Sequence, residues 1–327
     1  MNLTSPSQVK DWCIRNKFHP NRVLGQNFLI DRNALDAILD AALPPTSTRQ
    51  QSESVAKPVA HSVGTAPRAV CGGRGATALP GFATASSNNP TIALEIGPGL
   101  GVLTEGLLER GCAVTAVEKD PVLADRLKAS LGNPERLTVL KGDALDFIKQ
   151  GACDGFPLMV SNLPYQAGTR ILIELVERIG QKVASSQLKH SNTQTLKHFS
   201  SPETMVVLVQ TEVAERLAAK EGSKTRGLAG VRVQLDYDVQ IVRKVAASCF
   251  WPRPEVGSTV VKLVRHHRND AVGGEVRAMF RRLTKQAFEH RRKQLGSIFK
   301  GVVESTARAE DLSNEDWLEL SRMLSRT

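Results

Sequence analysis

A glycine-rich segment, Glu95-Ile-Gly-Pro-Gly-Leu-Gly101, joins the apolar run 92–96 to an amphipathic stretch at 102–109. Glycine lets the backbone turn tightly and approach a ligand closely, and the helix that follows such a turn points its N-terminal amides at that ligand. A strand, a glycine turn and a helix in this order are typical of a doubly wound α/β sheet. The segment therefore predicts both a fold class and a ligand site at the turn.

The chain repeats this alternation of strand and helix. We expect strands at 92–96, 113–117, 137–140, 158–160, 205–209, 231–237 and 259–264. Helices are expected at 102–109, 121–131, 169–179 and 212–220. Apolar strands separated by amphipathic helices predict a mostly parallel, Rossmann-like α/β sheet. After residue 266 the pattern is wholly helical, at about 274–300 and 314–324, which predicts a small C-terminal helical domain.

Two polar stretches interrupt the α/β pattern. Residues 44–90 are rich in Ser, Thr, Ala, Gly and Pro, and residues 181–201 are also polar. A segment with the composition of 44–90 can bury too little apolar surface to fold, so we expect a disordered insertion at these residues. We expect a surface insertion at 181–201. Both would interrupt a domain that spans 1–266, and the helical domain then covers 267–327.

The chain is basic, with a formal net charge of +10 over its 327 residues. A basic surface is typical of proteins that bind polyanions. Between residues 276 and 300, eight Lys and Arg residues accompany a single acid, Glu289. We interpret this segment as a contact for an RNA or DNA backbone, although a basic amphipathic helix can also bind a membrane or a partner protein. The candidate phosphate-binding residues are Arg281, Arg282, Lys285, Arg291, Arg292 and Lys293.

No apolar run approaches the roughly 20 residues needed to span a bilayer, and the N-terminus is polar. The five cysteines are not at Cys-x-x-Cys spacing, which indicates neither a zinc site nor a disulfide framework. We therefore expect a cytoplasmic protein that contacts no membrane and holds no metal.

Carboxylates after the next two strands complete a candidate ligand site with Gly97 and Gly99. Glu118 ends the second strand, where an acid can accept both hydroxyls of a ribose. Asp143 follows the third strand, where it can accept an adenine amine or cap a helix. A glycine turn alone also fits a nicotinamide dehydrogenase. The spacing Glu-x-Gly-x-Gly-x-Gly differs from the dinucleotide pattern and favours S-adenosylmethionine, whose charged tail is an amino acid rather than a pyrophosphate.

A second motif, Asn162-Leu163-Pro164-Tyr165, follows the strand at 158–160. Ligands of such folds bind at the carboxyl edge of the sheet. The Asn162 side-chain carbonyl and the backbone carbonyl of Leu163 or Pro164 can accept the two hydrogens of an adenine N6 amine and orient its lone pair. Tyr165 offers a face on which an extruded base can stack. The two motifs together favour an enzyme that methylates an exocyclic amine on a base, although a turn that happens to read Asn-x-Pro is the simpler alternative for the second motif.

With these residues assembled, the chain resembles the small-subunit ribosomal RNA adenine dimethyltransferase family. The resemblance covers most of the chain outside the two insertions. Its motifs are 24–30 (LGQNFLI), 94–101 (LEIGPGLG), 117–120 (VEKD), 142–145 (GDAL), 162–165 (NLPY), 210–217 (QTEVAERL), 250–256 (FWPRPEV) and 287–295 (AFEHRRKQL).

This resemblance implies a class I S-adenosylmethionine-dependent methyltransferase fold and dimethylation of two adjacent adenosines in a hairpin near the 3′ end of small-subunit rRNA. We expect the enzyme to act as a monomer in ribosome biogenesis. The resemblance also implies donor contacts from Asn27, Leu29, Gly97, Glu118, Asp143 and Asn162. It places Phe250 opposite Tyr165 across the base, unless Phe250 is simply a core residue.

Three segments depart from the family pattern, and all lie on the acceptor side. They are 166–168 (QAG), 226–230 (RGLAG) and 252–256 (PRPEV). They bear on efficiency and target preference more than on the reaction. The alternatives are a large-subunit rRNA adenine methyltransferase of the macrolide-resistance kind and a non-catalytic ribosome-assembly factor. A nicotinamide dehydrogenase would leave the motif at 162–165 without a role.

Overall fold

The computed structural model describes residues 2–21, 24–43, 90–179 and 200–326. The expected insertions at 44–90 and 181–201 lie outside the described residues, except for Pro90, Ser200 and Ser201. Ser201 is buried and its hydroxyl lies 2.6 Å from that of Tyr237, so the second polar stretch ends before this residue. None of the described helices is long and apolar enough to cross a membrane.

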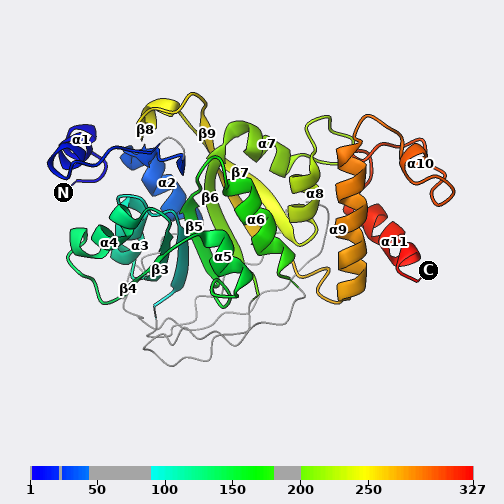
Figure 1. The fold of residues 1–327 in the computed structure, drawn as a ribbon, viewed down its shortest axis with the longest axis horizontal. Coiled ribbons are helices and arrows are strands. Elements are labelled where there is room, and N and C mark those ends of the chain that lie inside the picture. Colours follow the sequence, from blue (N-terminus) through cyan, green and yellow to red (C-terminus); the bar gives the residue numbers. More distant parts are fainter. Residues whose placement is uncertain (1, 22–23, 44–89, 180–199, 327) are drawn as a thin grey trace, which may run out of the picture. The chain divides into compact units, whose positions relative to one another are not determined.

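The centre of the fold is a sheet whose strands follow the order β4-β3-β2-β5-β6-β9-β7 (Figure 1). The first five run parallel, β9 is added antiparallel to β6, and β7 is added antiparallel to β9. Their bounds are β2 (Ile92–Ile96), β3 (Ala113–Glu118), β4 (Leu137–Lys141), β5 (Leu158–Asn162), β6 (Thr204–Gln210), β7 (Tyr237–Val245) and β9 (Ser258–Arg265). The prediction of a mostly parallel, Rossmann-like sheet is confirmed.

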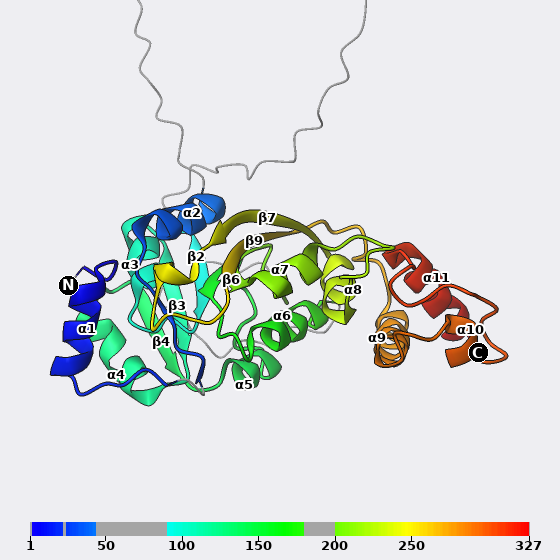
Figure 2. The same cartoon turned by 90° about the horizontal axis from the view of Figure 1, so that it is seen from above.

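Helices cover both faces of this sheet (Figure 2). Along β6, Val206 and Leu208 pack into one apolar cluster, and Val207 and Val209 pack into another. Such a strand, buried on both faces, reads as a continuous apolar run. The first cluster includes residues of α1 (Pro6–Arg15), α2 (Arg32–Ala42), α3 (Val102–Glu109) and α4 (Pro121–Ser130). The second includes residues of α5 (Ala144–Lys149), α6 (Gly168–Glu177), α7 (Thr211–Ala218) and α8 (Leu228–Gln234).

A third apolar cluster holds the C-terminal helices together. Its buried residues include Phe280 and Leu283 of α9 (Gly274–Glu289), Leu295 of α10 (Leu295–Ile298), and Trp317 of α11 (Asn314–Leu324). The predicted helical character of this region is confirmed, although 290–294 separates α9 from α10. The cluster also takes in Val231 of α8, and the predicted domain boundary near residue 266 stays a prediction.

The strand predicted at 231–237 is wrong. Residues 228–234 form the helix α8, and β7 begins only at Tyr237. The prediction failed because α8 is packed on two sides: Val231 belongs to the C-terminal cluster and Val233 to the cluster on the sheet. Apolar residues two positions apart therefore imitate a strand. Gly230 also brings α8 close to α7, since a Cβ atom here would lie 2.4 Å from the Arg216 carbonyl oxygen.

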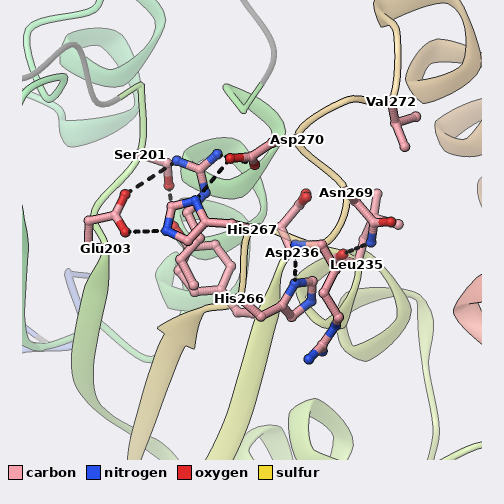
Figure 3. Close-up of polar contacts among 12 residues, drawn as sticks. Ser201, Glu203, Leu235, Asp236, His266, His267, Asn269, Asp270 and Val272 are labelled. Carbon is pink, nitrogen blue, oxygen red and sulfur yellow. Dashed lines mark hydrogen bonds and ion pairs between the residues drawn. The ribbon is translucent and has the colours of Figure 1, made fainter. Parts of the chain in front are cut away.

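Ion pairs fix the junction between the sheet and the C-terminal helices. Arg277 of α9 is buried and forms two hydrogen bonds, of 2.8 and 2.9 Å, with the buried carboxylate of Asp236. Nearby, His267 lies between two carboxylates, with Nε2 2.7 Å from Glu203 and Nδ1 2.9 Å from Asp270 (Figure 3). Arg265 contacts the same two carboxylates, so the four side chains form a ring of alternating charge.

This ring predicts a pH-dependent contribution to stability. The hydrogen bond to Asp270 is the main cause that raises the pKa of His267. Burial works against ionisation of Asp270, yet hydrogen bonds from His267 and Arg265 hold the pKa of this carboxyl below its ordinary value. A histidine whose pKa is raised by folding stabilises the folded state, and this contribution is complete at pH values below the ordinary pKa of 6.5. The contribution is lost as pH rises through the pKa of the folded state. The carboxylate contribution is lost only as pH falls below 3.8.

We therefore expect His267→Gln to destabilise the protein most between pH 4 and pH 6.5, the ordinary values of the two groups being 3.8 and 6.5. The difference from wild type should shrink as pH rises further. Urea unfolding across this pH series measures it, with His290→Gln, an exposed histidine, as the control. A difference that grows with pH would contradict the charged ring.

Candidate active site

One pocket opens at the carboxyl edge of the sheet, beside β2. The strand order reverses here, because β3 pairs with one side of β2 and β5 pairs with the other. Ligands of doubly wound sheets bind at such a point of reversed strand order. The pocket brings together residues that the sequence predicted separately. Those that line it are Asn27, Leu29, Gly97, Gly99, Glu118, Asp143, Asn162, Leu163, Pro164 and Tyr165.

The glycine turn between β2 and α3 forms the floor of this pocket. Gly97, Gly99 and Gly101 all have positive φ angles, which glycine adopts without steric cost. At Gly99, a Cβ atom would lie 3.1 Å from the Phe28 ring, so a larger residue would also crowd the N-terminal segment. The turn therefore lets a ligand approach its backbone closely.

Glu118 lies at the end of β3 and its side chain is held by the backbone. Its two oxygens accept hydrogen bonds from the amides of Gly99, at 3.0 Å, and Asp120, at 2.8 Å. Burial raises the pKa of Glu118, and these two bonds oppose that effect. Each carboxylate oxygen has a further lone pair, so Glu118 can still accept ribose hydroxyls.

The acid of the glycine motif, Glu95, also lines the pocket, although its side chain is buried. It is 1% exposed and accepts a hydrogen bond of 2.6 Å from the Thr104 hydroxyl. Burial raises the pKa of Glu95 to about 8. Burial therefore favours the neutral form of Glu95.

Asp143 has two partners in the structure. One oxygen caps α5 by accepting the Leu145 amide at 2.9 Å, and the other pairs with the Lys119 ammonium at 2.9 Å. The hydrogen bond from Lys119 is the main cause that lowers the pKa of Asp143. The helix-cap interpretation is thus correct, and an adenine amine at this carboxylate would share an oxygen with Lys119.

The segment 24–29 lies across the edge of the sheet and joins the two halves of the pocket. The side-chain amide of Gln26 donates to Asp120 at 2.8 Å. The side-chain amide of Asn162 donates to the backbone carbonyl of Asn27 at 3.0 Å. Because this bond uses the nitrogen of Asn162, its Oδ1 atom is the one that can accept hydrogens from a base.

The structure also separates the two backbone carbonyls that the sequence left as alternatives. The Pro164 carbonyl accepts the amides of Ala167, at 3.1 Å, and Gly168, at 2.7 Å, and so closes the turn into α6. The Leu163 amide continues the sheet by donating to Leu208 at 3.1 Å. Because the Pro164 carbonyl already accepts two amides, we expect the Leu163 carbonyl to be the acceptor for a base amine.

The two predicted aromatic residues lie in different environments. Tyr165 is partly buried and lines the pocket. Phe250 is 2% exposed and belongs to an apolar cluster beneath the pocket rather than to its lining. Phe250 lies in the short strand β8 (Phe250–Trp251), which pairs with β1 (Phe28–Leu29) and places Phe250 opposite Leu29. The predicted stacking role of Phe250 stays a prediction and would require its ring to become uncovered.

The basic C-terminal segment is only partly a free surface. Arg282, Lys285, Arg292 and Lys293 are exposed, whereas Arg281 is partly buried. Arg291 donates to the Lys224 carbonyl and pairs with Glu310 at 3.5 Å. Arg277, which contributed to the basic charge of this stretch, is buried against Asp236 and is therefore not part of the surface.

Sequence reasoning missed the roles of Gln26, Lys119 and Gly25. Gln26 and Gly25 lie inside a motif that the sequence analysis quoted, but nothing in the sequence connects Gln26 with Asp120. Gly25 has a φ of +66°, and a Cβ atom there would lie 3.4 Å from the Tyr165 backbone nitrogen. The sequence signal for Gly25 was a glycine close to Asn27 and Leu29, which were both assigned to the donor site.

Comparison with known proteins is consistent with this geometry. The model of the family described as "Ribosomal RNA adenine dimethylase" matches residues 82–324. The chain belongs to the ribosomal RNA adenine dimethylase family. It is 37% identical over 234 residues to the ribosomal RNA small subunit methyltransferase A of Bifidobacterium longum, covering 65% of this chain and 69% of that protein. With the enzyme of the same name from Mycobacterium avium the identity is 31% over 341 residues, 98% of this chain and 87% of the relative.

Solved structures agree on the fold. A dimethyladenosine transferase from Plasmodium falciparum superposes with a TM-score of 0.61 at 20% identity, covering 91% of this chain and 97% of the other. The 23S rRNA methyltransferase ErmE superposes with a TM-score of 0.50 at 22% identity, covering 74% and 93%. At these identities the likeness shows the fold alone.

The methyl donor of this family is S-adenosylmethionine, and the residues present fit it. Gly97 and Gly99 allow a close approach to the backbone, and we expect Glu118 to accept the ribose hydroxyls and Asp143 the adenine amine, since all four residues line the pocket. Among the described residues that line the pocket, the only side-chain cation is Lys119, which is paired with Asp143.

We expect S-adenosylmethionine to bind and NAD not to bind. Glu118→Ala should weaken donor binding by about 1–3 kcal/mol, the scale of a lost hydrogen bond to a charged group. Isothermal titration calorimetry with both ligands measures this, and Asp125→Ala, an exposed acid on α4, serves as the control. NAD binding without an S-adenosylmethionine signal would contradict the assignment.

Proposed function

We propose that this protein transfers methyl groups to the N6 amine of two adjacent adenosines in the 3′-end hairpin of small-subunit rRNA during ribosome biogenesis. The observation that carries the proposal is the Asn162–Asn27 hydrogen bond. It holds the side chain of Asn162 through its nitrogen and so leaves Oδ1 to accept a base amine, and Asn162 lines the same pocket as the candidate donor residues. The names of the curated relatives supply the small ribosomal subunit as the substrate class.

The chemistry follows from the acceptor residues. The lone pair of an adenine N6 amine is delocalised into the ring, which makes this amine a poor nucleophile. Asn162 Oδ1 and the Leu163 carbonyl would accept its two hydrogens, turn the lone pair towards the donor, and stabilise the positive charge that develops on nitrogen. Bound S-adenosylmethionine supplies the electrophilic methyl group. The base must leave its helix to reach the pocket, and Tyr165 offers its ring as a stacking surface.

The proposal is tested with immature small ribosomal subunits from cells that lack this protein. Purified enzyme and labelled S-adenosylmethionine should produce dimethyladenosine at two adjacent positions, identified by mass spectrometry of rRNA fragments. Methylation of large-subunit rRNA alone would favour the macrolide-resistance type of enzyme. Binding to the small subunit with no methyl transfer would favour a non-catalytic assembly factor.

Asn162→Ala should slow methyl transfer far more than it weakens RNA binding. An acceptor that stabilises charge only in the transition state lowers turnover rather than ground-state affinity. By analogy with oxyanion-hole donors, its loss costs about 2.7–4 kcal/mol, or roughly 100- to 1000-fold in rate. Single-turnover rates at saturating donor measure the effect, with Asn33→Ala, an exposed asparagine on α2, as the matched control. An unchanged rate with weakened RNA binding would make Asn162 a docking residue.

The exposed cations of the C-terminal segment should contact rRNA phosphates. Replacement of Arg282, Arg292 and Lys293 by glutamine should reduce the log–log salt slope of RNA binding by about 0.7–0.9 for each lost contact. The control replaces three exposed lysines outside this segment, Lys10, Lys128 and Lys149. Equal effects of the two triple variants would show that only overall charge matters.

A further inference from the structure

Tyr165 is anchored at its far end by a residue from another part of the sheet. Its hydroxyl lies 2.5 Å from the Oγ atom of Ser258. Ser258 is fully buried, whereas Tyr165 is partly exposed in the pocket. Buried tyrosine hydroxyls usually find a hydrogen-bond partner, and this contact supplies one.

Ser258 is a rigid anchor because it begins the middle strand of an antiparallel trio. It pairs with Gln210 of β6 on one side and with Val245 of β7 on the other. The adjacent Gly257 carbonyl also accepts the Thr211 amide at 3.0 Å. Tyr165, in contrast, lies in the turn between β5 and α6. The turn fixes the backbone end of the tyrosine, and Ser258 fixes the ring.

We propose that Ser258 is a positioning residue for methyl transfer, which holds the Tyr165 ring at the angle on which the extruded adenine stacks. The inference rests on the stacking role of Tyr165 in the proposed function. Ser258 touches neither base nor donor in this mechanism and acts only through Tyr165.

This role predicts a specific defect in the second methyl transfer. The unmodified N6 amine has two hydrogens, which Asn162 and Leu163 would both accept. After one transfer and loss of a proton, the amine keeps a single hydrogen, so the monomethylated base is held by one acceptor fewer. Its orientation then depends more on stacking, and a loosened Tyr165 ring should slow the second transfer more than the first.

The test compares Ser258→Ala with Tyr165→Phe, since each removes one partner of the same hydrogen bond. Both should slow single-turnover methylation by about 5- to 10-fold, the rate equivalent of one hydrogen bond, with RNA affinity unchanged. The fraction of monomethyladenosine among products, measured by nucleoside mass spectrometry, should rise. The double variant should be no slower than the slower single variant, because the two residues act as one unit.

The chain offers a matched control in its other tyrosine–serine pair. The Ser201 hydroxyl lies 2.6 Å from the hydroxyl of Tyr237. Ser201 precedes the first residue of β6, whereas Ser258 pairs with the last residue of β6, so the two serines lie at opposite ends of this strand. Ser201 is buried as well and lies beside Glu203, in the region of the charged ring (Figure 3). Ser201→Ala removes a bond of the same chemistry, and we expect it to leave the rates and the product ratio unchanged.

The chain has two tyrosines, so ring-labelled tyrosine gives a simple NMR readout. Ser258→Ala should move the Tyr165 signal and Ser201→Ala the Tyr237 signal. Wild-type rate and product ratio in Ser258→Ala or Tyr165→Phe would overturn the inference, and so would an equal defect in Ser201→Ala. Failure of the wild-type enzyme to methylate small-subunit rRNA would instead refute the proposed function.

Discussion

The hydrogen bond between the Asn162 side chain and the Asn27 carbonyl joins residues 135 positions apart and holds the two halves of the pocket together. Asn27 belongs to a segment with little regular structure, since β1 contains only two residues. This segment is held by the pairing of β1 with β8, by the Gln26–Asp120 bond and by Asn162 itself. The two halves of the pocket therefore keep a fixed arrangement only when the N-terminal segment is folded across the edge of the sheet.

The antiparallel strands β9 and β7 connect this pocket to the rest of the molecule. At one end of β9, the Ser258 hydroxyl contacts the hydroxyl of Tyr165. At the other end, Arg265 belongs to the charged ring, and Asp236, which precedes β7, pairs with Arg277 of α9. The same pair of strands thus contacts the turn that we propose binds the base and anchors the helices that carry the exposed cations. A rigid sheet transmits docking geometry better than a loop, because its hydrogen bonds resist shear between neighbouring strands.

The sequence was sufficient to predict those helices and strands whose apolar residues all pack into one cluster. Helices α3 and α11 begin and end where their periodicity predicted, because each presents a single apolar face. Helix α8 was misread because Val231 and Val233 face two different clusters, a property of the tertiary structure. The short strands β1 and β8 have no periodicity to detect, since each is two residues long.

The same distinction explains the site. Gly97, Glu118 and Asn162 could be predicted because the carboxyl ends of neighbouring strands always meet at one edge of a parallel sheet. The contacts of Gln26 with Asp120 and of Lys119 with Asp143 depend on side-chain geometry across that edge, which no spacing encodes. The charge of Arg277 was read correctly, but its burial against Asp236 depends on where the fold places this carboxylate, which the pattern of the helix does not encode.

Backbone groups explain how the acceptor site can depart from the family pattern at 166–168. The turn into α6 is closed by hydrogen bonds from the amides of residues 167 and 168 to the Pro164 carbonyl, and these bonds require no particular side chain at either position. The size of residue 168 does matter, since a Cβ atom there would lie 3.0 Å from the Cβ atom of Leu163. A larger residue would press on Leu163, whose carbonyl we propose as an acceptor for the base amine. Glycine at this position therefore lets α6 begin directly against Leu163.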